Sequence, residues 1–271
     1  MAQNPELQER YSSLVLAKQR KTSVFAKLFN RNYDGTPTAG AVKIPVRDTE
    51  VEVKDYDKTN GTELTTSTTT YITLPIDHDA SVNELIDKHT AAAVPDNLVA
   101  ERLDSAGYSM AVETDTNLGN ALLECTAIKD TAALTPDTIY KAVIDARTQA
   151  RKAHVKTSEM WLTVTPDAYG VLLQCPEFIK PSNLGDQVVQ EGVVGRIGGI
   201  DIYEVDNLSD DKVDFILGNR IFCHYVDDWA VPVSVNDLAD GKHIGACAVQ
   251  GRNVYGYKVS KPTTVFVRKH V

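Results

Sequence analysis

The most suggestive chemical feature of this sequence is a run of glycines. Gly192, Gly195, Gly198 and Gly199 lie within EGVVGRIGGIDIYEV. A phosphate-binding glycine loop follows a strand and opens a helix, so that backbone N–H groups face the phosphate. Here the glycines lead into a strand-like stretch at residues 200–205, and no Gly-Lys-Ser/Thr sequence follows them. The pattern therefore favours a tight turn over a nucleotide site.

Histidine and cysteine do not have the spacing of metal ligands. The six histidines form no HxxxH or HExxH pair. His78 lies between Asp77 and Asp79, and a solvated strand end explains this triplet better than a metal site. The cysteines are far apart, contain no CxxC pair and are expected to be reduced thiols: Cys125, Cys175, Cys223 and Cys247.

Nothing else in the sequence has the pattern of a catalytic site. The aspartates do not follow the spacing of a calcium-binding EF-hand loop, and no serine lies in a GxSxG elbow. We therefore predict no catalytic residue, no metal and no cofactor, and we do not expect an enzyme.

Composition and charge indicate a soluble globular protein with an uneven charge distribution. The 271 residues are 42% apolar and 24% charged, and no apolar run is long enough to span a membrane. The net charge is −9, yet residues 1–31 hold six basic and two acidic residues, giving +4, so the remainder carries −13. The basic segment is expected to pair with an acidic neighbour or to touch nucleic acid.

The first 77 residues have two unusual segments. Residues 1–32 contain apolar side chains without a single period, so this arm is expected to lie against another surface. Residues 40–77 read as a long two-stranded hairpin around the turn signal Asn60-Gly61, with arms of about 15 residues that could span ~50 Å. Because such a hairpin is not stable alone in water, we expect it to reach a neighbouring subunit.

A long helix is predicted at residues 95–118. Val99, Leu103, Ala106 and Met110 recur at helical spacing and form one apolar stripe. Gly107, in the middle of the pattern, predicts a bend or close packing. Before this helix, Ser81 and Glu84 match a capping box and predict a short helix ending near residue 89.

The second half of the chain predicts a compact α/β unit followed by returning strands. A helix is expected to begin at Thr135-Pro136, with Ile139, Val143, Ala146 and Ala150 on its buried face. Strands are expected at residues 161–164, 200–205 and 213–218, with a short helix near 168–173. The last 30 residues read as strands that pair with earlier elements.

Taken in order, this layout resembles the HK97-like major capsid proteins of tailed bacteriophages. The local sequences that carry the resemblance are WLTVTPDAYGVLL, GVVGRIGGIDIYEVDNL and VDFILGNR. The resemblance implies an α+β fold with an N-terminal arm at 1–32, a hairpin called the E-loop at 33–77 and a P domain at 78–132 with the spine helix 95–118. It also implies an A domain at 133–225 and strands that return to the P domain at 226–271.

The resemblance implies a coat protein that self-assembles into the icosahedral head around double-stranded DNA. Its expected partners are copies of itself in pentamers and hexamers, scaffold, portal and decoration proteins, and packaged DNA contacted without sequence specificity; no membrane is expected. It would be made in the bacterial host cytoplasm and located in the virion. Assembly contacts are expected at the hairpin tip, the arm and the A-domain turn: Lys54, Asp55, Lys58, Asn60, Gly61, Val24, Phe25, Phe29, Gly195, Arg196 and Gly198.

Encapsulin nanocompartment shells, which share this fold and a similar length, are the alternative. The helix that usually receives their cargo peptide has no clear counterpart in the N-terminal residues here.

Overall fold

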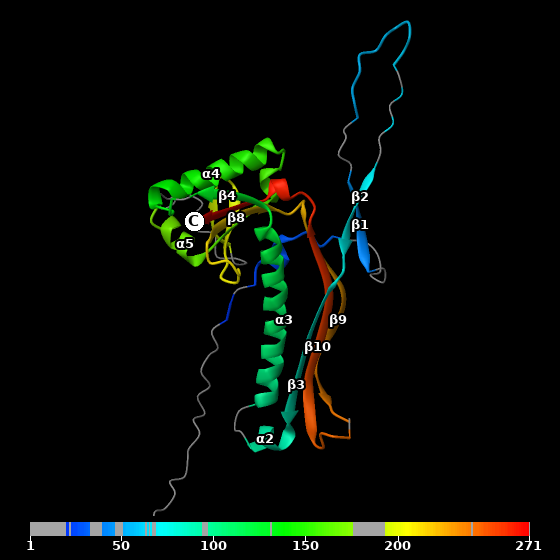
Figure 1. Cartoon of the computed structure of the whole chain (residues 1–271), viewed down its shortest axis with the longest axis vertical. Coiled ribbons are helices and arrows are strands. Elements are labelled where there is room, and N and C mark those ends of the chain that lie inside the picture. Colours follow the sequence, from blue (N-terminus) through cyan, green and yellow to red (C-terminus); the bar gives the residue numbers. More distant parts are fainter. Residues whose placement is uncertain are drawn as a thin grey trace, which may run out of the picture.

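The computed structural model describes residues 20–21, 23–32, 40–46, 51–62, 64, 66, 69–93, 97–130, 132–175, 193–239 and 241–270. The described residues form a mixed α+β fold with sheets of two, three and six strands. Figure 1 shows the long helix α3 beside the three-stranded sheet, the six-stranded sheet with its helices at one end, and the two-stranded hairpin extending away from both.

The predicted long helix is α3, but its limits differ from the prediction. It runs from Leu98 to Leu123, and the side chain of Asn97 caps it by accepting the N–H of Ala100 at 3.4 Å. Residues 95 and 96 lie outside the described residues. The helix continues past residue 118 because Leu118 and Leu122, one turn apart, are both buried in the same core.

The glycine that packing requires in α3 is Gly119. A Cβ atom there would lie 2.8 Å from Cε2 of Phe25 and 2.9 Å from Cδ2 of Leu208. A Cβ atom at Gly107 would meet nothing within 4 Å, so the predicted close packing at Gly107 is wrong. The sequence pattern could not distinguish the two glycines, because their neighbours come from distant parts of the chain.

The three-stranded sheet packs against α3. Its order is β3 (His78–Asp87), β10 (Ala246–Val259), β9 (Cys223–Asp237), and both pairs are antiparallel. Ile86 and Val249 of the sheet and Ala106 of the helix belong to one buried cluster.

The predicted short helix from the Ser81–Glu84 capping box is wrong. These residues belong to β3, whose burial alternates along its length, with Val82 and Ile86 on the covered face. Pairing with β10 satisfies the backbone groups of residues 78–87 that face β10, so helix forms only afterwards, in α2 (Lys88–Ala93).

The six-stranded sheet has the order β4-β11-β8-β5-β7-β6, with β4–β11 and β5–β7 parallel and the other pairs antiparallel. Its strands are β4 (Thr126–Asp130), β5 (Met160–Val164), β6 (Val193–Ile197), β7 (Ile200–Glu204), β8 (Val213–Asn219) and β11 (Phe266–His270). The remaining elements of this half are α4 (Pro136–Lys152), α5 (Pro166–Leu172) and the 3₁₀ turns Thr157–Glu159 and Pro262–Thr264.

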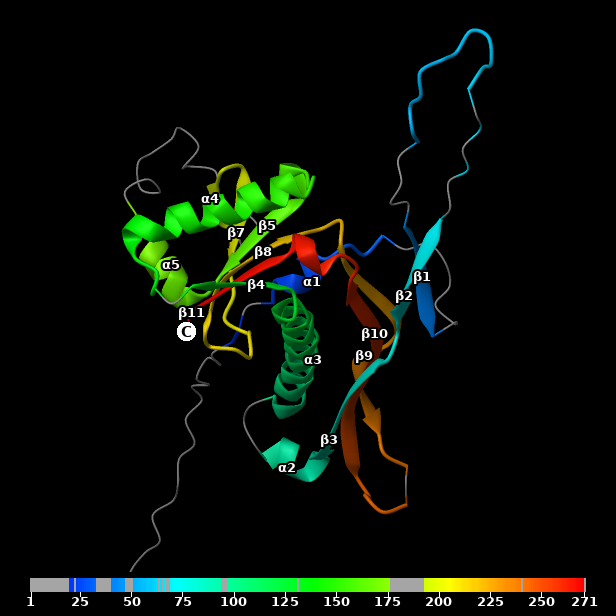
Figure 2. The ribbon, with the colours of Figure 1, turned by 45° about the horizontal axis from the view of Figure 1, so that its top comes forward.

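The helix α4 confirms its predicted start and buried face. It begins at Pro136, and all four residues assigned to that face are buried: Ile139, Val143, Ala146 and Ala150. They form one core with Leu162 and Ile202 of the six-stranded sheet, and α5 contributes to the same core. Figure 2 shows α4 and α5 beside this sheet.

The strand pairing does not follow the predicted domain boundaries at β4, β11 and β9. β4 lies within predicted P-domain residues and β11 within the predicted return strands, yet both pair in the six-stranded sheet. β9, which joins the three-stranded sheet, begins at Cys223, before the predicted boundary at 225. Parallel pairing of β4 with β11 joins segments far apart in the sequence, so the pattern of either strand alone could not reveal it.

The described part of the N-terminal arm is anchored within its own subunit. It contains one helical turn, α1 (Phe25–Leu28), and the ring of Phe25 packs edge-on against Trp161 with 6.3 Å between centroids. Arg20 forms an ion pair with Asp104 of α3, and Arg31 forms one with Asp227 of β9. These pairs support the interpretation of the basic arm as a partner of acidic neighbours.

Candidate assembly surfaces

The hairpin tip is a turn organised by Asp57. The Asp57 carboxylate accepts hydrogen bonds from the backbone N–H of Thr59 and the side-chain amide of Asn60, both at 2.8 Å. The backbone carbonyl oxygen of Asp57 accepts the N–H of Gly61, also at 2.8 Å. The bond from Thr59, followed by that from Asn60, lowers the pKa of Asp57. Gly61 has a φ of +73°, which favours glycine. The predicted turn is thus present.

Apolar side chains around the tip are exposed to solvent. Val51, Val53 and Tyr56 are 79%, 95% and 73% exposed, and Leu64 is fully exposed. Lys54 lies 3.7 Å from Glu52 in a surface ion pair. Several highly exposed apolar side chains on one projecting segment are typical of an interaction surface.

The root of the hairpin is firmly attached to the subunit. Here β1 (Ala41–Val46) pairs antiparallel with β2 (Thr70–Pro75) over six residues each, shorter than the predicted arms. Leu74 is fully buried, and the Lys258 ammonium donates to the carbonyl oxygen of Thr73 at 2.8 Å. A Cβ atom at Gly256 would clash with the carbonyl oxygen of Pro75, so only glycine allows this close crossing of β10 and β2. No sequence motif marked Gly256.

The predicted glycine-rich turn joins β6 to β7 at the edge of the six-stranded sheet. Gly198 and Gly199 have φ values of +57° and +82°, which confirms the tight turn. A Cβ atom at Gly198 would lie 3.1 Å from Cδ of Arg147 in α4. Arg196 is exposed and forms an ion pair with Asp201 across the hairpin, while Gly195 lies where the register of the β6–β7 pair shifts.

The arm residues that we predicted as assembly contacts are internal. Val24, Phe25 and Phe29 are at most 5% exposed and pack with Leu118 and Leu122 of α3. Hydrogen bonds from the backbone of this segment to the carboxylate of Asp115 hold it in place. Because these side chains are buried within their own subunit, their burial argues against a role in binding a second subunit. The sequence pattern did not reveal that the arm completes this core.

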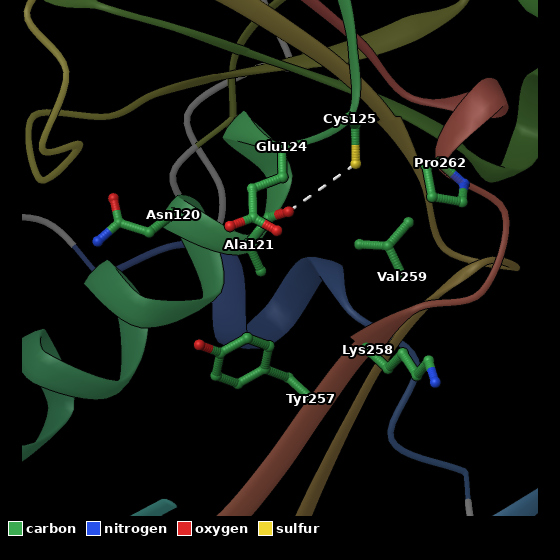
Figure 3. Close-up of a pocket in the computed structure, with 8 residues that line it drawn as sticks. All are labelled: Asn120, Ala121, Glu124, Cys125, Tyr257, Lys258, Val259 and Pro262. Carbon is green, nitrogen blue, oxygen red and sulfur yellow. Dashed lines mark hydrogen bonds between the residues drawn. The ribbon is translucent and has the colours of Figure 1, made fainter. Parts of the chain in front are cut away.

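A shallow pocket of about 370 Å³ lies beside the hairpin root, between the end of α3 and β10 (Figure 3). Its lining includes Glu124, Cys125, Tyr257 and Lys258. Burial, and then the charge of Glu124, raise the pKa of the Cys125 thiol to about 11, which opposes nucleophilic chemistry there. All four cysteines are buried, and none of them forms a disulfide bond.

The described residues also offer no metal centre and no membrane span. Within the described ranges, no three His, Cys, Asp or Glu side chains come together in a way that could hold a metal ion. Among the helices of the described part, none is both long enough and apolar enough to cross a bilayer.

His78 lies at a strand end, as predicted, but its side chain is only partly exposed to solvent. It begins β3, and its ring is stacked on Tyr255 and Tyr257 of β10, with centroid distances of 5.3 and 4.6 Å. Its surroundings are therefore aromatic as well as acidic, which the flanking aspartates did not indicate.

Comparisons with known proteins find similarity at the level of structure. No family model and no curated protein sequence matches the chain. A structure from Mycobacterium phage Che8 matches with a TM-score of 0.80 and 26% identity, covering 98% of both chains. The capsid structure of cyanophage P-SCSP1u matches with a TM-score of 0.78 and 16% identity over 98% of this chain and 93% of the other. The mature capsid of bacteriophage PhiM1 matches with a TM-score of 0.72 and 15% identity over 97% and 92%.

Proposed function

Because the chain has the HK97-like fold of the phage capsid structures that it matches, we propose that it is a major capsid protein. It self-assembles into the head of a tailed phage and is a structural component of the virion. The observation that carries this proposal is the match over nearly the full length of both chains, with TM-scores of 0.72 to 0.80.

The shape of the subunit supports assembly through repeated contacts. The hairpin extends away from the body (Figure 1), and the apolar side chains around its tip are exposed to solvent. A projecting element that binds a different surface on the next copy makes a heterologous contact, and such contacts close into rings and shells. We assign the tip residues Lys54, Asp55, Lys58, Asn60 and Gly61 to this contact.

The β6–β7 turn is the second surface that we assign to assembly. Gly195, Arg196 and Gly198 lie on or beside β6, an edge strand of the six-stranded sheet. In the HK97-like arrangement, this region would face the symmetry axis of a pentamer or hexamer. Scaffold, portal and decoration proteins are further partners that such an assembly would use.

The charge distribution suits a container for double-stranded DNA. The residues after position 31 carry a net charge of −13. DNA binding depends on clustered lysine and arginine, so an acidic wall holds packaged DNA weakly and without sequence preference. The encapsulin alternative is not favoured, because the similar structures named above come from phages.

Electron microscopy of the purified full-length chain, with light scattering of the same sample, tests this proposal. Closed shells tens of nanometres across, or rings and tubes of capsomers, are the expected result. If only monomers or dimers form, co-expression with neighbouring viral genes is the next step. A chain that still fails to assemble with those genes is not a capsid protein.

A further inference from the structure

The arginines in the described ranges divide into two groups. Six of the nine pair with a carboxylate: Arg20, Arg31, Arg102, Arg196, Arg252 and Arg268. The other three, Arg147, Arg151 and Arg220, form no ion pair with any residue that the structure describes. Acidic residues outnumber lysines and arginines by 37 to 28 in this chain, so these three are not unpaired for want of carboxylates.

Arg220 lies at the end of the six-stranded sheet where β5 begins. Met160, the first residue of β5, pairs with Asn219, the last residue of β8. The backbone N–H of Arg220 donates to the carbonyl oxygen of Glu159 at 2.9 Å. The β6–β7 turn lies at the same end of the sheet, because β7 runs parallel to β5.

The other two unpaired arginines are held in place near this turn. A Cβ atom at Gly198 would lie 3.1 Å from Cδ and 3.2 Å from Nε of Arg147, so the Arg147 side chain lies against the turn. Its Nε atom is buried and has no hydrogen-bond partner in the described part of the chain. One helical turn further along α4, Nη1 of Arg151 donates to the carbonyl oxygen of Val155 at 2.8 Å. Two arginines about 6 Å apart along the helix axis are therefore positioned while most of their N–H donors lack an acceptor among the described residues.

Two lysines extend this group of cations. Residues 146–156 contain two arginines, two lysines and no carboxylate, a charge of +4 that leaves −13 for the rest of a chain whose net charge is −9. Both lysines, Lys152 and Lys156, are exposed. On the neighbouring β6–β7 hairpin, Asp201 already pairs with Arg196. We call the group the α4 basic surface; its members are Arg147, Arg151, Lys152, Lys156 and Arg220.

The dipole of α4 explains only part of this surface. Cations in the last turn of a helix stabilise it, and Arg151 and Lys152 lie in the last turn of α4. Arg147 precedes that turn, whereas Lys156 and Arg220 lie outside the helix. Neighbouring cations without counter-charges repel one another, and a bound polyanion relieves that repulsion.

We propose that the α4 basic surface binds the phosphate backbone of double-stranded DNA, an inference that rests on the function proposed above. Guanidinium groups bind phosphate through paired N–H donors, and lysines add point charges. Contacts to phosphate carry no sequence information, so binding is independent of sequence. A subunit that is otherwise acidic thereby holds DNA at one defined place and repels it elsewhere.

Fluorescence anisotropy of a labelled DNA duplex tests this proposal with the full-length chain. Binding to a duplex of about 30 base pairs is measured between about 50 and 200 mM salt, and light scattering confirms that all samples have the same assembly state. Three to five phosphate contacts predict that the logarithm of the binding constant falls against the logarithm of the salt concentration with a slope of about −3 to −4.5.

Variants with equal changes in charge locate the binding surface. Arg147→Gln combined with Arg151→Gln should weaken binding about tenfold to a hundredfold near 0.1 M salt and reduce the steepness of the slope by about two. Arg102→Gln combined with Arg252→Gln removes two arginines that already pair with carboxylates, so affinity should stay within about twofold of the wild type. If the first variant does not fold, Lys152→Gln combined with Arg220→Gln, at two exposed positions, should weaken binding in the same way.

Three results would overturn the proposal. The first is a wild-type chain that does not bind the duplex, and the second is equal weakening in both double variants, which would show that only net charge matters. The third is a polyglutamate chain that binds more tightly than DNA and displaces it, which would identify a docking surface for an acidic protein. Because the assay needs no closed shell, a chain that forms shells but fails it contradicts this inference alone.

Discussion

The carboxylate of Asp115 accepts the backbone N–H of Val24 at 3.1 Å, across 91 positions of sequence. The same carboxylate accepts the N–H of Ala26 at 3.0 Å and a side-chain N–H of Asn207. Asp115 is fully buried in the middle of α3. One charged side chain thus joins the arm, the long helix and the loop before β8.

Replacement of Asp115 by asparagine tests this junction. The amide nitrogen would face N–H donors that now bind a carboxylate, so we expect a loss of about 2–4 kcal/mol in the free energy of unfolding. Urea denaturation followed by circular dichroism measures it. Asp104→Asn removes the exposed ion pair with Arg20 and should leave the midpoint near that of the wild type. Equal effects of the two substitutions would contradict the central role of Asp115.

The two glycines of α3 are expected to respond oppositely to alanine. Gly119→Ala forces the new methyl group against Phe25 and should cost about 1–3 kcal/mol. Gly107→Ala adds a methyl group in open space and improves helix propensity, which should gain about 0.5–1 kcal/mol. Thermal denaturation of both variants measures the difference, and a stabilised Gly119→Ala chain would show that the arm does not pack as described.

Gly256→Ala should detach the hairpin root. The methyl group would clash with the carbonyl oxygen of Pro75 and lie 3.0 Å from Cα of Ile76, and neither backbone atom can move without displacing β2. We expect faster hydrogen exchange at residues 71–77 and impaired assembly. Gly170→Ala, at an open position of α5, is the control and should assemble normally. Unchanged exchange in Gly256→Ala would contradict the described crossing.

The hairpin tip should be dispensable for folding and necessary for assembly. Deletion of residues 54–61 removes side chains that are exposed in the subunit, so the cooperative unfolding transition should persist. Electron microscopy should show no closed shells, because the surface for the neighbour is lost. Asp57→Asn, which keeps the length and the backbone acceptor of the turn but loses one of the two side-chain acceptors, is the milder control. Shells formed by the deletion variant would exclude the tip as an essential contact.

Buried His224 should make stability fall in acid. Burial lowers its pKa to about 4, against the ordinary value of 6.5, and its Nε2 lies 2.9 Å from Oγ of Ser260. Below pH 6.5 the unfolded chain binds a proton that the folded chain does not accept until about pH 4. The free energy of unfolding therefore decreases by about 3 kcal/mol as the pH falls through this window. Urea midpoints at several pH values should show a shallower decline in His224→Gln, and an equal decline would exclude His224 as the cause.

Local patterns in the sequence determined much of the secondary structure. The start and buried face of α4 follow from Thr135-Pro136 and a helical repeat of apolar residues, and the β6–β7 turn follows from consecutive glycines. These features depend on neighbours within a few positions, where backbone preferences and periodicity act directly. The order of such elements was also sufficient to indicate the fold.

Only the tertiary structure decided which surfaces are internal and which are free. Ser81 and Glu84 match a helix signal, but pairing with β10 places both residues in a strand. Phe25 belongs to an irregular arm in the sequence, yet its ring fits against Gly119 and Trp161 in a buried core. Burial and pairing are properties of contacts between distant segments, and a residue's own neighbours in sequence do not specify the partner that will cover it.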